Sequence, residues 1–204
     1  MKILVFGASG RVGRRLCEYA HGDGHAVTAF VRDAVDAPAD VATAVGDVSD
    51  VGTVSAAVSG VDAVCSALGP DDAEDTSVLV DGTDNIVTAM QSHGVDRLVA
   101  VAAAGILQAT PSRLRLDMVE FPHRLRRLAA AHCEVYGRLR DSSLDWTLAC
   151  PPEMPDGSPT NHYRTAVDYL PEGGQSISTG DVARFVYDAV TANRHVGERV
   201  GLAY

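Results

Sequence analysis

The chain of 204 residues has little of several features that mark particular protein classes. Its four cysteines show neither CxxC nor metal-ligand spacing, so they predict small buried side chains in a reducing compartment and no metal site. No apolar stretch approaches the ~20 residues of a membrane span, and the N-terminus becomes glycine-rich too early for a signal peptide. Together these absences predict a cytoplasmic protein that does not insert into a membrane.

Positive charge is also scarce. The net charge is −10 at pH 7, which argues against nucleic acid or an anionic membrane as the main partner. The charge is uneven, because residues 97–140 contain eight arginines and three acids, a local balance of +5, and the remainder carries −15. Two interpretations stay open: the arginines cover a solvated helix face, or they attract an anionic cofactor or substrate.

The most informative motif lies at the N-terminus. A buried-type apolar run at residues 3–6 stops at Gly7, and Gly10 and Gly13 follow at intervals of three. Helical spacing of apolar residues resumes directly behind them, which predicts a strand, a tight turn and a helix that opens at the turn. A plain strand–turn–helix is the simpler alternative.

A helix start leaves about four backbone N–H groups unpaired and carries a partial positive charge, so it suits a pyrophosphate. Gly7 would permit the turn, Gly10 would let the backbone approach phosphate oxygens, and Gly13 would let helix and strand pack closely. We therefore predict that the amides from Ser9 to Val12 hold the phosphates of a dinucleotide.

Apolar runs and helix-like stretches alternate along the rest of the chain. The spacing predicts strands at 25–31, 41–45, 63–68, 98–104 and 145–150, helices at 50–59, 75–93, from Pro122 onward and at 179–193, and a last strand near 199–203. This alternation predicts a doubly wound parallel sheet of the Rossmann-like α/β class. We expect a single domain over 1–204, with residues 151–204 as a small C-terminal cap on the substrate side. The oligomeric state is left open.

The ordered set of short motifs resembles the atypical short-chain dehydrogenases/reductases, in particular the NAD(P)H-binding group that contains flavin reductase, also called biliverdin-IX beta reductase. The resemblance covers almost the whole chain. Its landmarks are Gly7-Ala-Ser-Gly-Arg-Val-Gly13, Val31-Arg-Asp33, Gly46-Asp-Val48, Gly60-Val-Asp-Ala-Val64, Ala67-Leu-Gly69, Asn85-Ile-Val87, His93-Gly-Val-Asp96, Leu139-Arg140 with Ser143-Leu144, and Pro151-Pro152.

The cofactor residues follow partly from position and partly from this resemblance. Arg32 ends the second strand, where an NAD-binding protein would normally carry an acid, so it favours the 2′-phosphate of NADP(H) over NAD(H). A surface arginine is the alternative, and the neighbouring Asp33 would repel phosphate. Arg11 could add a second phosphate contact, or be a solvated side chain at the helix start. The resemblance further implies an adenine pair and a cofactor-lining set: Asp47 and Val48, then Ala67, Leu68, Gly69, Ala102 and Pro151. Asp47 could equally cap a helix or turn.

The chemistry is constrained by a missing side chain. The only lysine is Lys2, so the Tyr-x-x-x-Lys pair of many short-chain reductases is absent, and Arg140 cannot replace lysine beside Tyr136 because arginine stays protonated. Against the flavin reductase pattern, Ala103 stands where the family has a serine and Glu153 where it has a histidine.

Several side chains on the acceptor side have two interpretations. Glu153 could be a general acid if buried, or a loop carboxylate, and His123 could lie at the pocket rim. His132 matches a family histidine but suits a structural role, and Trp146 suits the core. Met154, Tyr163 and Leu107 could form apolar walls or be ordinary packing.

Direct hydride transfer to a flavin needs no Tyr-Lys pair. The sequence therefore predicts an NADPH-dependent reductase of a flavin or another planar conjugated acceptor. With 5% aromatic residues, the chain offers few stacking platforms, so flavin is expected as a substrate and not as a tightly bound group. The alternative is a non-catalytic NADP(H)-binding redox sensor. A nucleotide-sugar epimerase is a third, less favoured reading.

Overall fold

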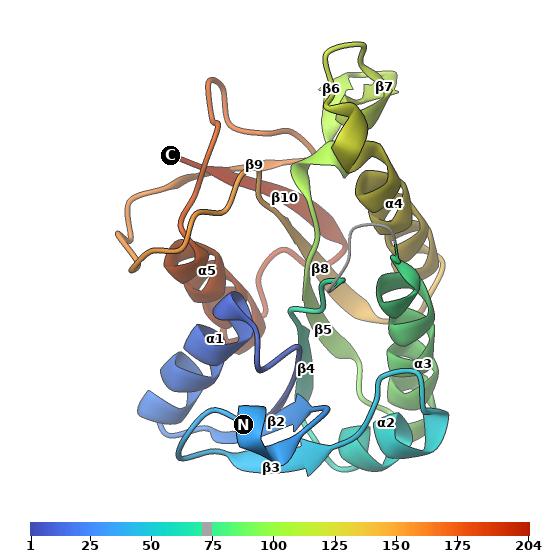
Figure 1. Ribbon diagram of the computed structural model, residues 1–204, viewed down its shortest axis with the longest axis vertical. Helices are drawn as coiled ribbons and strands as arrows, with labels where there is room; N and C mark the ends of the chain where they lie inside the picture. The colour runs from blue at the N-terminus through green and yellow to red at the C-terminus, as the bar shows by residue number, and fades with distance from the viewer. Residues whose placement is uncertain (71–74) are drawn as a thin grey trace.

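The computed structural model describes residues 1–70 and 75–204, and eight of the strands in these residues form a twisted central sheet (Figure 1). The strands are β1 (Lys2–Phe6), β2 (Ala26–Val31), β3 (Ala42–Val45), β4 (Ala63–Ser66), β5 (Arg97–Val101), β8 (Asp145–Cys150), β9 (Arg164–Val167) and β10 (Glu198–Ala203). Their order is β3-β2-β1-β4-β5-β8-β10-β9, and the pairs are parallel except β10 with β9. The predicted doubly wound, Rossmann-like α/β fold is confirmed.

Helices cover both faces of the sheet. The helices are α1 (Arg11–Gly22), α2 (Val51–Val58), α3 (Ser77–His93), α4 (Arg126–Arg140) and α5 (Thr179–Thr191). Figure 1 shows α1 and α5 on one face and α2, α3 and α4 on the other. Strand β1 explains the two layers, because Ile3 and Val5 pack in the α1/α5 core whereas Leu4 and Phe6 pack in the opposite core.

Local signals set several helix ends. Helix α3 stops at Gly94, which has φ 67° as a left-handed C-terminal glycine should. Helix α5 begins with Ser178, whose side chain accepts a hydrogen bond from the Asp181 amide. The predicted ends of these two helices are therefore close to those observed.

Other predicted boundaries need correction. The fifth strand ends at Val101 and not at 104, because a 3₁₀ helix, η2 (Ala104–Ile106), follows it. Helix α4 begins at Arg126, because residues after Pro122 first form a separate 3₁₀ turn, η4 (His123–Leu125). Leu125, the last residue of this turn, is 36% exposed.

Two features were not predicted. A short hairpin of β6 (Gln108–Thr110) and β7 (Arg113–Leu114) projects above α4 in Figure 1, followed by η3 (Arg115–Asp117). Strand β9 lies at the sheet edge and pairs antiparallel with β10. Both strands of the C-terminal third thus extend the main sheet.

The buried carboxylate of Asp181 ties that C-terminal third together. It accepts hydrogen bonds from the backbone of Thr160 at 2.9 Å and Asn161 at 2.8 Å, and from the Tyr204 hydroxyl at 2.7 Å. Burial alone would raise the pKa of Asp181, but these hydrogen bonds outweigh it and hold the pKa below its ordinary value. In the described residues, no helix combines the length and apolar character needed to cross a bilayer.

Candidate functional site

A cavity of about 660 Å³ opens at the carboxyl ends of β1, β2, β3 and β4. The chain order reverses between β1 and β4, and such a switch point is where doubly wound sheets bind ligands. Ten residues expected to contact a cofactor line this cavity: Gly7, Ser9, Gly10, Arg11, Arg32, Asp47, Val48, Ala67, Leu68 and Gly69.

The glycine turn depends on the absence of side chains. Gly7 has φ 70°, and a Cβ there would collide with the carbonyl of Ala67 on the neighbouring strand end. A Cβ on Gly13 would collide with the Gly7 carbonyl, so Gly13 allows α1 to lie against the turn. The packing roles predicted for Gly7 and Gly13 therefore match the geometry.

The start of α1 suits an anionic group. Gly10 is its N-cap and provides no side-chain cap, and the first turn of this fully described helix contains no acid. The first amides of the helix therefore meet no competing carboxylate, and Ser9, Gly10 and Arg11 beside them face the cavity. A pyrophosphate fits this arrangement. Val12 contributes only backbone here, since its side chain is 8% exposed and packs in the core.

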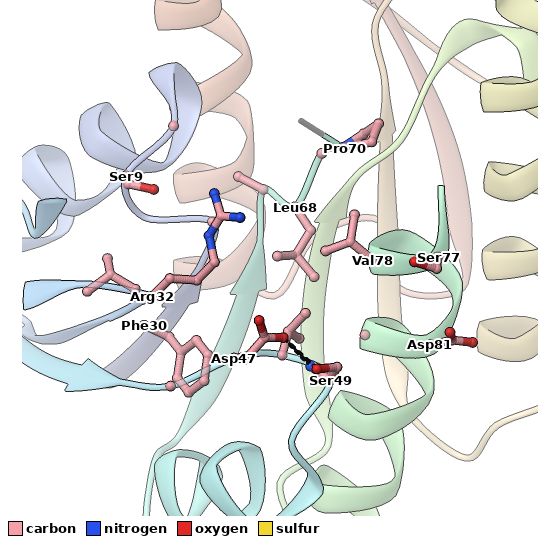
Figure 2. Close-up of a pocket in the computed structure, with 18 of the residues that line it drawn as sticks. Ser9, Phe30, Arg32, Asp47, Ser49, Leu68, Pro70, Ser77, Val78 and Asp81 are labelled. Carbon is pink, nitrogen blue, oxygen red and sulfur yellow. Dashed lines mark hydrogen bonds between the residues drawn. The ribbon is translucent and has the colours of Figure 1, made fainter. Parts of the chain in front are cut away.

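Arg32 extends from the end of β2 into the cavity, as Figure 2 shows. The neighbouring Asp33 is engaged elsewhere: its carboxylate accepts a hydrogen bond from the Val35 amide at 3.1 Å and caps η1 (Ala34–Asp36). The Asp33 carboxylate therefore caps η1. It should repel an anion beside Arg32 less strongly than its adjacent position in the sequence suggested.

Asp47 has a visible structural role. Its Oδ1 accepts hydrogen bonds from the Ser49 amide at 2.8 Å and the Ser49 hydroxyl at 2.7 Å, drawn in Figure 2. These bonds, with a smaller contribution from Arg32, lower the pKa of Asp47. The turn-capping alternative is thus present in the structure, and the exposed carboxylate also lines the cavity.

The side of the cavity formed by α3 was missed. The lining residues that were not predicted are Ser77, Val78, Asp81 and Gly82 of α3 with the preceding Asp75, and also Phe30, Val31, Gly46, Ser49 and Pro70 at the ends of β2, β3 and β4. Val78 and Asp81 lie far along the chain from the glycine turn, so only the packing of α3 beside the strand ends brings them there. Gly82 carried the one readable signal, because a glycine in a helix interior often marks a close approach.

Two arginines of α1 connect the turn to its surroundings. Arg11 Nη1 donates to the Met154 carbonyl at 3.3 Å. Arg14, which sequence reasoning did not single out, donates from Nε to the Ser9 carbonyl at 2.9 Å and from Nη2 to the Asp36 carbonyl at 2.8 Å. Arg14 therefore braces the glycine turn against η1.

The carboxyl ends of β5 and β8 adjoin one another. The Ala102 amide donates to the Ala149 carbonyl at 2.7 Å, and the Ala104 amide donates to the Pro151 carbonyl at 2.8 Å. Ala102 and Pro151 are buried and Ala103 is half-buried. Of the described residues, these lie outside the set that lines the cavity, so they sit farther along the same edge of the sheet.

The acceptor-side candidates are dispersed. The side chains of Glu153 and His123 are exposed. His132 is buried in α4, and burial lowers its pKa to about 4. Leu107, considered as an apolar wall, is fully buried and belongs to the core.

Tyr136 lies in a packed aromatic group on α4. Its ring meets Trp146 edge-on at 5.8 Å between centroids, and the Arg199 guanidinium lies 4.4 Å from its centroid. Met154 and Tyr163, the other suggested walls, are half-buried against the α1/α5 core. Burial raises the pKa of Tyr163 to about 12.

Solved structures share this architecture. The chain aligns over its whole length with a candidate exported protein from Burkholderia pseudomallei, at 33% identity and a TM-score of 0.89, covering 100% of that chain. It also aligns over its whole length with a candidate NADH-flavin reductase from Streptococcus pneumoniae TIGR4, at 27% identity and a TM-score of 0.88, covering 99% of that chain.

A relative in Bacillus subtilis (strain 168), the uncharacterized protein YwnB, is 30% identical over 209 residues, covering 98% of this chain and 96% of its own length. Residues 7–193 match the model of a family described as NAD(P)H-binding, a span that includes the glycine turn, Arg32, Asp47 and Val48. This chain belongs to the NAD(P)H-binding family.

Proposed function

We propose that the protein is an NADPH-dependent reductase that passes hydride to a flavin or another planar conjugated acceptor. One observation carries the proposal: the uncapped start of α1, Arg32 and the Asp47–Val48 turn all line a single cavity at the switch point of the sheet. Along that edge these three features suit, in the same order, the pyrophosphate, the 2′-phosphate and the adenine of NADP(H).

Arg32 is the proposed determinant of cofactor choice. A guanidinium can engage a 2′-phosphate through two parallel hydrogen bonds, whereas the ribose hydroxyl of NADH offers no charge for it. Its position in the cavity and the diversion of Asp33 to cap η1 both support NADP(H) over NAD(H).

When bound, reduced nicotinamide supplies the hydride. The residues at the carboxyl ends of β5 and β8, with Ala102 and Pro151 among them, would position it, and the rate would depend on that placement. Tyr136 is engaged with Trp146 and Arg199, so it is not proposed as an acid. Glu153, His123 and position 103 remain the acceptor-side groups to test.

The acceptor is proposed as a substrate that comes and goes. Similarity to the Streptococcus pneumoniae protein, a candidate NADH-flavin reductase, supports a flavin-like acceptor here. The scarcity of aromatic side chains argues against a permanently held flavin. The four free cysteines also support a reducing, cytoplasmic setting.

The test is NADPH oxidation, followed by loss of its absorbance, with FMN, riboflavin and a menadione-type quinone as acceptors. We expect turnover with at least one acceptor and a clear preference for NADPH over NADH. Faster oxidation of NADH would contradict the cofactor assignment.

A second function has specific support. Alanine at position 103 and an exposed carboxylate at Glu153 replace two polar groups of the flavin reductase pattern. Both changes favour a redox sensor that binds NADP(H) without turning it over. Tight NADPH binding with no turnover across the acceptor panel would establish that alternative and overturn the reductase.

A further inference from the structure

The cavity changes character along its length. Arg32 and the glycine turn occupy one part, whereas Leu68 and Val78 give the part beside α3 an apolar wall (Figure 2). Val48, which packs against Gly82 of α3, also lines the cavity. A flat, uncharged ring binds against apolar surface, so under the proposed function this is where the base of the cofactor lies. The position of Val48 therefore controls the width available to that base.

Helix α3 holds Val48 in two independent ways. The Asn85 side-chain amide donates a hydrogen bond to the Val48 carbonyl at 2.9 Å. Gly82, one turn earlier on the same helix, leaves the space into which the Val48 side chain fits. A Cβ on Gly82 would lie 2.9 Å from Val48 Cγ1, 3.1 Å from Val48 Cγ2 and 3.4 Å from Leu68 Cδ1.

We propose that Gly82 and Asn85 are positioning residues for the cofactor's base, acting through Val48. Asn85 fixes the backbone of the Asp47–Ser49 turn, and Gly82 lets the valine side chain recede toward α3. An alanine at position 82 would push Val48 toward the cavity, because a β-branched side chain has few other rotamers available. The slot for the base would then narrow.

The helix itself gives no reason for a glycine at position 82. Gly82 lies inside α3, its φ is not positive, and alanine is the better residue for a helix interior. The close approach of Val48 and Leu68 is what the glycine permits. In Gly82→Ala, crowding against Val48 would therefore offset the gain in helix propensity, so stability should change little. Weaker binding of the base without a matching loss of stability is a result that a purely structural role would not produce.

The experiment compares Gly82→Ala with the matched control Gly137→Ala. Gly137 lies inside α4, and a Cβ added there meets nothing within 4 Å, so this variant gains helix propensity without crowding. The probe is 2′-phospho-ADP-ribose, which carries the base and lacks nicotinamide, titrated by calorimetry. Thermal melting is measured on the same samples.

We expect Gly82→Ala to weaken the probe by about tenfold while its melting temperature stays close to that of the wild type. Gly137→Ala should bind as the wild type does. Asn85→Asp, which keeps the size of the side chain and removes the donor, should also weaken the probe. If the protein turns over, the KM for NADPH should rise in Gly82→Ala with kcat unchanged at saturation.

Unchanged affinity for the probe in both Gly82→Ala and Asn85→Asp would overturn the inference. A loss of affinity accompanied in both variants by a lower melting temperature would also overturn it, because general destabilisation would then explain the weaker binding. These outcomes differ from failure of the proposed function, in which the wild-type protein itself would bind neither NADPH nor the probe.

Discussion

The two ends of the sheet's carboxyl edge differ sharply. The half formed by β1 to β4 and α3 is a defined cavity whose walls include a tight glycine turn, an arginine side chain and a valine held by α3. The half near β5 and β8 offers buried alanines and, just after β8, an exposed Glu153. The first half has the geometry of specific binding, and the second has little that resembles acid–base machinery. Under the proposed function, the fold itself would provide recognition of the cofactor, whereas catalysis would depend on how nicotinamide and acceptor are placed.

The largest effect should come from crowding the glycine turn. In Gly13→Ala the new methyl group would meet the Gly7 carbonyl and the Ala8 backbone, which cannot move without opening the turn. We expect NADPH binding to be lost and the free energy of unfolding to fall by about 1–3 kcal/mol. Calorimetry and thermal melting measure the two effects.

The control for that variant lies on the same helix. A Cβ on Gly22, at the end of α1, meets nothing within 4 Å. Gly22→Ala should therefore bind NADPH normally. Normal binding by Gly13→Ala would show that the turn does not carry the phosphates.

A smaller, more selective effect is expected at Arg32. Arg32→Ala should weaken NADPH by about 1.5–3 kcal/mol, roughly ten- to a hundredfold, because a charged hydrogen-bond donor is lost. NADH should change little, and Arg32→Lys should fall between the two. Parallel titrations of both cofactors measure the selectivity, and equal losses would mean that Arg32 does not contact the 2′-phosphate.

The two regions also differ in how much of their structure could be predicted from the sequence. The succession of strands and helices, the glycine turn and ten of the cavity residues between Gly7 and Gly69 could be predicted, because these residues follow apolar runs that end a strand. The hairpin at 108–114 and strand β9 could not, since Gln108–Thr110 and Arg164–Val167 are short and lack a buried alternating face. Gly82 reaches the cavity, and Asn85 reaches the Val48 carbonyl, only through the tertiary packing of α3. A glycine inside a helical pattern was the one local sign of this packing.

Helix α4, beside the acceptor half, supplies a prediction on pH. Burial lowers the pKa of His132 from an ordinary value of about 6.5 to about 4, so the unfolded chain binds more protons between those values. The contribution of neutral His132 should be complete above about pH 6.5 and decrease as the pH falls toward 4, by at most ~1.4 kcal/mol per pH unit. Denaturant unfolding across this range measures it.

His132→Gln should remove this part of the pH dependence, whatever its stability at neutral pH. His123→Gln is the matched control, because His123 is exposed in the turn that precedes the same helix and should leave the slope unchanged. An identical slope in the wild type and in His132→Gln would show that His132 does not titrate as a buried group.

The smallest effects are expected where an acid–base mechanism would place the largest. Tyr136→Phe keeps the ring against Trp146 and removes only the hydroxyl, and Glu153→Gln neutralises an exposed carboxylate. We expect kcat to change less than about twofold in either, against the ~10²–10⁴ that a true general acid contributes. A loss of kcat of that size in Glu153→Gln would identify a catalytic residue near β5 and β8 and contradict the difference between the two halves of the sheet edge.

The most direct test of the central claim is a calorimetric titration of the unmodified protein with NADPH, NADP⁺, NADH and NAD⁺. We predict saturable binding at one site per chain, with NADPH and NADP⁺ bound more tightly than NADH and NAD⁺. Absence of heat with all four dinucleotides, confirmed by unchanged melting temperatures in their presence, would contradict it.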